Sequence, residues 1–152
     1  MSTLRSTIDR LRGVEQSLVI SDPVAMTIRR AYKLSPGRTS KLLDLPCWMN
    51  DWEMTTVQLT MDDTPWGGQN MISVRFSLHA QLFVRDADID RGAEIATAFH
   101  EAFLVALAKD MVQPGDEWDG TVRGGLKLLE WAGEAFPGLD LFVDCSFGIE
   151  NG

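Results

Sequence analysis

Residues 71–85, MISVRFSLHAQLFVR, alternate apolar and polar side chains almost without interruption. One parity is entirely apolar: Ile72, Val74, Phe76, Leu78, Ala80, Leu82 and Val84. After Met71, the other parity is polar apart from one phenylalanine: Ser73, Arg75, Ser77, His79, Gln81, Phe83 and Arg85. Because a β-strand points successive side chains to opposite faces, this stretch predicts a long strand with one face in a core and the other face outside it.

Residues 47–61 are rich in β-branched and aromatic side chains and predict a partner for this strand. Their parity slips around 54–57, which favours a bulge. The segment DDTPWGGQN at 62–70 separates the two strands and is dense in turn-forming residues. We therefore expect an antiparallel hairpin. Since strands of about 15 residues are longer than usual, its tip should project from the domain.

Two segments predict helices. Residues 3–18 carry apolar side chains at helical spacing. Residues 86–111 carry a wide apolar face, and Asp86 or Asp88 can cap the N-terminus of this helix. Residues 24–32 predict a further strand, 112–125 a loop, and the remainder two strands around 133–138. The order of these helices and strands predicts one α+β domain over residues 1–152. It has a mainly antiparallel sheet of about five strands, with both helices packed on one face.

Charge is distributed unevenly along the 152 residues, whose net charge is −8. Residues 1–43 hold eight basic and three acidic residues, for a net +5, whereas the remainder has a net −13. An acidic chain argues against duplex binding. The asymmetry could let copies associate head to tail, although it is also compatible with an ordinary solvated surface.

Catalytic and metal-binding signatures are weak. The chain has two histidines, His79 and His100, and its cysteines, Cys47 and Cys145, share no metal-knuckle spacing. The acidic segment at 86–90 lacks the glycine of a calcium loop, and helix capping explains it better. No stretch approaches the roughly 20 apolar residues of a membrane span. We expect a soluble intracellular protein without cofactor, metal or enzymatic activity, and a ligand-binding or enzymatic domain using both histidines is the remote alternative.

Five tryptophans fall mostly in or beside expected loops. Trp66 and Trp118 are flanked by glycine and aspartate, which makes them hard to bury within one copy. Large aromatic side chains at exposed positions are typical of protein–protein contacts. An interaction protein is therefore favoured over an enzyme.

The order of the parts resembles the tail terminator, or tail-completion, proteins of long-tailed bacteriophages. The resemblance rests on four segments: an N-terminal amphipathic helix ending in LVISDPVAMTIRRAY, a loop leading to LDLPCWMN, the strand and helix VRFSLHAQLFVRDADIDRGAEIATAFHEAFLVAL, and the terminal strand LDLFVDCSFGIE. It implies a ring, with six copies expected, that caps the head-proximal end of the tail tube, stops tube polymerisation and joins a head connector. DNA would pass through the ring without sequence-specific binding.

Two residue sets follow as hypotheses. The first would contact the tail tube or the connector: Asp62, Asp63, Trp66, Gln69 and Trp118. The second would form the subunit interface: Arg29, Arg30, Arg38, Lys41, Arg75, His79, Phe83 and Arg85. The expected location is the neck of a virion assembled in the host cytoplasm. Another neck component, such as a connector between portal and tail, is the nearest alternative.

Overall fold

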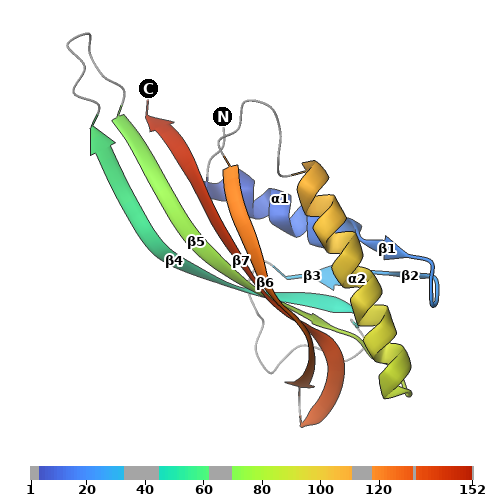
Figure 1. Ribbon diagram of the computed structural model, residues 1–152. Helices are drawn as coiled ribbons and strands as arrows, with labels where there is room; N and C mark the ends of the chain where they lie inside the picture. The colour runs from blue at the N-terminus through green and yellow to red at the C-terminus, as the bar shows by residue number, and fades with distance from the viewer. Residues whose placement is uncertain (1–3, 33–44, 62–69, 111–117, 132, 152) are drawn as a thin grey trace.

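The computed structural model describes residues 4–32, 45–61, 70–110, 118–131 and 133–151. These residues form two helices and seven strands. In chain order they are α1 (Leu4–Ser17), β1 (Val19–Ile20), β2 (Met26–Thr27), β3 (Arg30–Ala31), β4 (Cys47–Met61), β5 (Asn70–Phe83), α2 (Ile89–Asp110), β6 (Trp118–Trp131) and β7 (Glu134–Asn151). Figure 1 shows the long strands β4, β5, β7 and β6 side by side, with both helices on one side of them.

The main sheet has the strand order β3-β4-β5-β7-β6. All of its pairs are antiparallel except β3 with β4, which is parallel. The β4–β5 register shifts between Met54 and Thr56, where the change of parity predicts a bulge. The α+β class, the sheet and the helices on one face are therefore confirmed.

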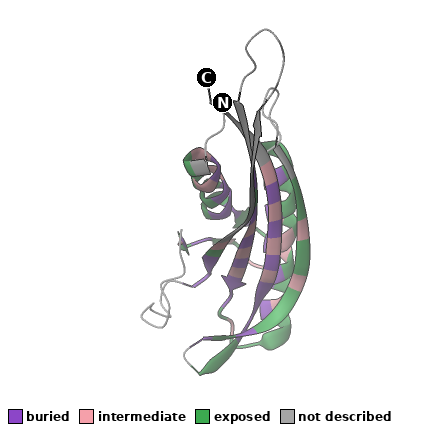
Figure 2. Cartoon of the chain, turned by 90° about the vertical axis from the view of Figure 1, so that its left-hand side faces the viewer, coloured by how far each residue is buried: buried purple, intermediate pink, exposed green. Residues whose placement is uncertain are grey.

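The apolar parity of β5 lies in the main core, together with the inner faces of both helices. Trp48 of β4 packs on Phe103 of α2, with ring centroids 5.0 Å apart. Buried residues alternate with less buried ones along the strands, as Figure 2 shows. The helices thus cover one face of the sheet, and the side chains of the other parity point away from them.

Two boundaries differ from expectation. Residues 24–32 do not form one strand, because the chain turns from pairing with β1 at Met26–Thr27 to pairing with β4 at Arg30–Ala31. Strand β6 begins at Trp118, inside the stretch expected to be a loop. The glycines there do not break the strand, since Gly124 takes a φ of 99° while β6 keeps its register with β7.

A second, smaller core lies on the face away from the helices. The alternation of residues 71–85 does not predict it. The buried members of this core are Leu45, Cys47, Met49, Phe83, Leu129, Trp131 and Phe136. One end of the sheet is therefore covered on both faces.

Candidate functional site

The face of the sheet that points away from the helices carries a band of polar and aromatic side chains, which we call the polar face. It is formed by three neighbouring strands, β5, β7 and β6. Its members are Arg75, Ser77, His79, Gln81, Arg123, Lys127, Asp140, Phe142, Asp144 and Ser146. Cross-strand register places them close together: His79 lies opposite Phe142, and Phe142 lies opposite Arg123.

Asp140 is the centre of one hydrogen-bond network on the polar face. Its Oδ1 contacts Nε2 of His79 and accepts a hydrogen bond from Nε2 of Gln81 at 3.0 Å. Nζ of Lys127 lies 3.7 Å from its Oδ2. Partial burial favours the neutral acid, but the hydrogen bonds from His79 and Gln81 outweigh it and lower the pKa of Asp140. Asp140 is therefore held as a carboxylate.

Asp144 is the centre of a second network two residues further along β7. Nε of Arg123 donates to its Oδ2 at 2.7 Å, and the hydroxyl of Ser77 donates to its Oδ1 at 2.9 Å. The hydrogen bond from Arg123 is the main reason that the pKa of Asp144 is lowered. Because both partners of this ion pair are partly solvent-exposed, it orders the surface more than it stabilises the fold.

Phe142 joins the two networks. His79 stacks on its ring with centroids 4.4 Å apart, and the guanidinium carbon of Arg123 lies 5.2 Å from the same centroid. Aromatic and cationic groups attract each other in this arrangement. The polar face is therefore a set of side chains with fixed partners across three strands.

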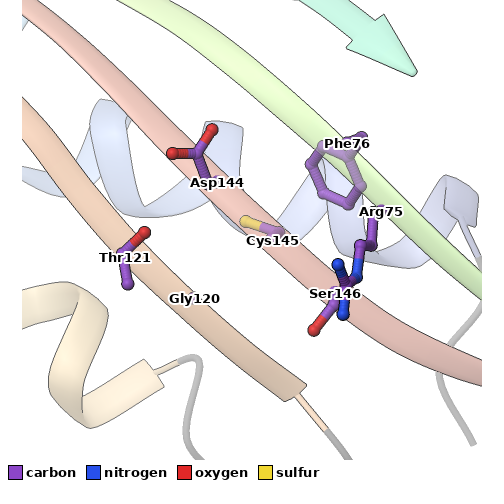
Figure 3. A pocket seen from close by; sticks show the side chains of 7 residues that line it. All are labelled: Arg75, Phe76, Gly120, Thr121, Asp144, Cys145 and Ser146. Atoms are coloured by element: carbon purple, nitrogen blue, oxygen red, sulfur yellow. The ribbon is translucent and has the colours of Figure 1, made fainter. Parts of the chain in front are cut away.

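A shallow hollow of about 400 Å³ lies beside the second network. Figure 3 shows the residues that line it, which come from β5, β7 and β6: Arg75, Phe76, Gly120, Thr121, Asp144, Cys145 and Ser146. Arg75 is exposed at its edge. The hollow offers a cation, a carboxylate and two hydroxyl groups, which suits contact with a polar surface.

Nucleophilic and metal chemistry find little support in the described ranges. No three His, Cys, Asp or Glu side chains there are close enough to hold a metal ion. The hydroxyl of Ser77 donates to Asp144 rather than to His79. Burial raises the pKa of the Cys145 thiol to about 12, so this thiol is not a ready nucleophile.

The structure places the expected interface residues in different surroundings. Arg29, Arg30, Arg75 and Arg85 are exposed, and His79 is held between Asp140 and Phe142. The expected exposure of Phe83 is wrong. Its side chain is 4% exposed and packs edge-on against Trp131, because the second core covers this end of the face.

Most of the expected tube or connector contacts lie outside the described ranges. Asp62, Asp63, Trp66 and Gln69 lie outside the described residues, as do Arg38 and Lys41 of the interface set. Trp118 is the first residue of β6. His100 lies half-buried on α2, away from the polar face.

Arg123, Asp140, Phe142 and Asp144 were not among the expected functional residues. Asp140, Phe142 and Asp144 contact β5 side chains, and Arg123 contacts Phe142 and Asp144. Alternation along residues 139–149 was the available signal, since it places Asp140, Phe142 and Asp144 on one parity. Which β5 residue each one meets depends on the β5–β7 register, and the two strands are separated by a helix and β6.

Comparison with protein-family models and with curated proteins finds no match to this chain. Neither helix of the described part is both long enough and apolar enough to cross a membrane.

Proposed function

We propose that this chain is a ring-forming structural protein of a phage or phage-like tail, with the role of a tail terminator. The observation that carries the proposal is that the main sheet has a long open edge on each side. In the described part of the chain, β6 pairs with β7 only, and β3 pairs with β4 only at Cys47 and Trp48. The outer edge of β4 therefore has no partner strand there from Glu53 to Met61.

Open strand edges present backbone donors and acceptors that another chain can pair with. The two edges belong to different strands on opposite sides of the sheet. An association that joins the β6 edge of one copy to the β4 edge of the next uses two different surfaces, so it is head to tail. Head-to-tail association closes into a ring when the rotation between copies permits it.

Charges near the two sides of the sheet support the same pairing. Arg29 and Arg30 are exposed at β3, on the β4 side of the sheet. Glu130 and Glu134 are exposed at the turn between β6 and β7, on the other side. Opposite charges on the two contacting surfaces would favour the head-to-tail arrangement and oppose pairing of like edges.

The terminator role rests on the resemblance in the order of parts, which the described elements retain: an N-terminal helix, a long hairpin, a second helix and two closing strands. In this role the ring caps the head-proximal end of the tail tube, stops its polymerisation and binds the head connector. DNA passes through the ring without sequence-specific recognition. The protein is then a component of the virion neck.

Light scattering on the purified full chain, alone and mixed with the tail tube protein of the same particle, tests this function. We expect a ring-sized oligomer that binds tube ends and limits tube length, visible by electron microscopy. A chain that stays monomeric at all concentrations and leaves tube length unchanged would overturn the proposal. A ring that binds portal-side proteins but not tubes would instead identify a connector.

A further inference from the structure

A buried carboxyl group lies where α1 meets the sheet. Glu15 of α1 and Asn50 of β4 are both fully buried. Nδ2 of Asn50 donates to Oε1 of Glu15 at 2.7 Å and to the backbone carbonyl of Tyr32 at 2.7 Å. The two side chains thus join the N-terminal helix to the strand beneath it.

The remaining oxygens of this pair lack donors. Oε2 of Glu15 and Oδ1 of Asn50 are buried, and neither has a hydrogen-bond partner in the described part of the chain. A buried acceptor without a donor is costly, and a buried carboxylate is more costly still. One proton on Oε2 resolves both problems, because a carboxylic acid and a primary amide are complementary. The acid carbonyl accepts from the amide N–H, and the acid O–H can donate to the amide oxygen.

Few charges face the pair. From α1 comes Arg12, whose Nε donates to the carbonyl of Ala31 at 2.8 Å. The β3 region contributes Tyr32. The guanidinium carbon of Arg30 lies 4.4 Å from the centroid of the Tyr32 ring. β4 contributes the neutral Asn50, and the residues that α2 adds to the adjoining core are apolar. Burial raises the pKa of Glu15 to about 8, although the hydrogen bond from Asn50 and the charge of Arg12 act in the opposite direction.

We propose that Glu15 and Asn50 form a closed acid–amide pair that fastens α1 to β4, and that loss of the Glu15 proton loosens α1 from the sheet. When the proton passes to solvent, the acid–amide pair loses one of its two hydrogen bonds. The new carboxylate then faces an amide oxygen in a fully buried site. Movement of α1 outward hydrates the charge. This pH-sensitive fastening is a property of the single copy and does not depend on ring formation.

Infrared spectroscopy of the full chain tests the protonation directly. At a pH where ordinary carboxyl groups are ionised, about 6.5, we expect a carbonyl band of a protonated carboxyl group that disappears with a midpoint near 8. The band should be absent in Glu15→Gln and retained in Glu101→Gln, which changes an exposed glutamate on α2 in the same way. Absence of the band from the wild type, or its persistence in Glu15→Gln, would overturn the proposal.

Hydrogen exchange of α1 amides, corrected for the intrinsic effect of pH, tests the loosening. If the opened state hydrates Glu15, the opening equilibrium of α1 should rise roughly tenfold per pH unit between about 5 and 8. In Glu15→Gln, whose amide can make the same two contacts, α1 protection should be independent of pH. An equal pH trend in both proteins would overturn the proposal. If Glu15→Gln does not fold, Glu15→Met serves as the carboxyl-free reference for both measurements.

Discussion

The imidazole of His79 lies flat on the ring of Phe142, with the two planes 2° apart. We expect this stacking to stabilise the fold by about 1 kcal/mol beyond simple burial. Urea unfolding of His79→Ala, Phe142→Leu and the double variant would measure it as a coupling energy. The cycle cancels the loss of the His79–Asp140 contact, which is removed in both backgrounds. Additive effects would show that the stacking contributes nothing.

The lowered pKa values of Asp140 and Asp144 predict a loss of stability in acid. As the pH falls below about 4, the unfolded chain binds protons at these carboxylates before the folded chain does. The free energy of unfolding should therefore decrease as the pH is lowered. Urea titrations between about pH 3 and about pH 6 should show a weaker pH dependence in Asp144→Asn than in the wild type.

Glu130→Gln, which changes an exposed carboxylate on β6, is the matched control for the acid experiment. Its pH dependence should follow that of the wild type. Equal slopes for Asp144→Asn and Glu130→Gln would contradict the assignment of acid sensitivity to the hydrogen bonds that Asp144 accepts from Arg123 and Ser77.

The variant Phe83→Ala tests whether Phe83 belongs to the second core and not to the exposed surface. Because its side chain is buried beside Trp131, Phe83→Ala should lower the free energy of unfolding by about 3 kcal/mol. Arg85→Ala, two residues further along and exposed, should change it by less than about 0.5 kcal/mol. Chemical denaturation compares the two. A stable Phe83→Ala protein that is impaired only in self-association would return Phe83 to the subunit interface.

How much of the fold the sequence predicts depends on how far apart in the chain the interacting residues lie. The alternation along β5, the helical spacing of Leu11 and Val14, and the parity slip near Met54 are local signals, and each predicts its element correctly. The sequence does not predict the start of β6, because glycines such as Gly124 and Gly125 are typical of loops. In the sheet, a positive φ at Gly124 is compatible with continuous pairing.

The sequence predicts only the β5 part of the polar face, for a related reason. The β5 side chains are evident from parity alone, but their partners Asp140 and Phe142 depend on a register between distant strands. Burial of Phe83 could not be foreseen, since it requires Leu129, Trp131 and Phe136 to gather on the same end of the sheet. The pairing of Glu15 with Asn50 depends on helix docking, which leaves no local pattern.

Gly124 should be the less replaceable of two adjacent glycines. A Cβ added there would lie 2.1 Å from the carbonyl oxygen of Asp140, and its φ of 99° disfavours other residues. We expect Gly124→Ala to destabilise the fold by about 3 kcal/mol. Gly125→Ala meets no atom within 4 Å and should be nearly neutral. Thermal unfolding of both variants checks the contrast, and equal melting temperatures would contradict it.

Charge reversal tests the head-to-tail ring. The double variant Arg29→Glu, Arg30→Glu should weaken self-association, because it places like charges opposite Glu130 and Glu134 of the next copy. Adding Glu130→Arg and Glu134→Arg should restore assembly. Sedimentation velocity at low salt, where surface charges are least screened, measures both effects. If the fourfold variant assembles no better than the double variant, these residues do not face each other in the assembly.

The strand order also constrains how the polypeptide acquires its shape. β4–β5 and β6–β7 are each hairpins of neighbouring segments, whereas the central β5–β7 pair joins residues as far apart as Asn70 and Asn151. Contacts between distant residues form slowly because a large loop must close first. During synthesis on the ribosome, the inner edge of β5 stays bare until β7 has been made. We therefore expect the β4–β5 hairpin, before β7 is made, to be the folding intermediate most prone to aggregation.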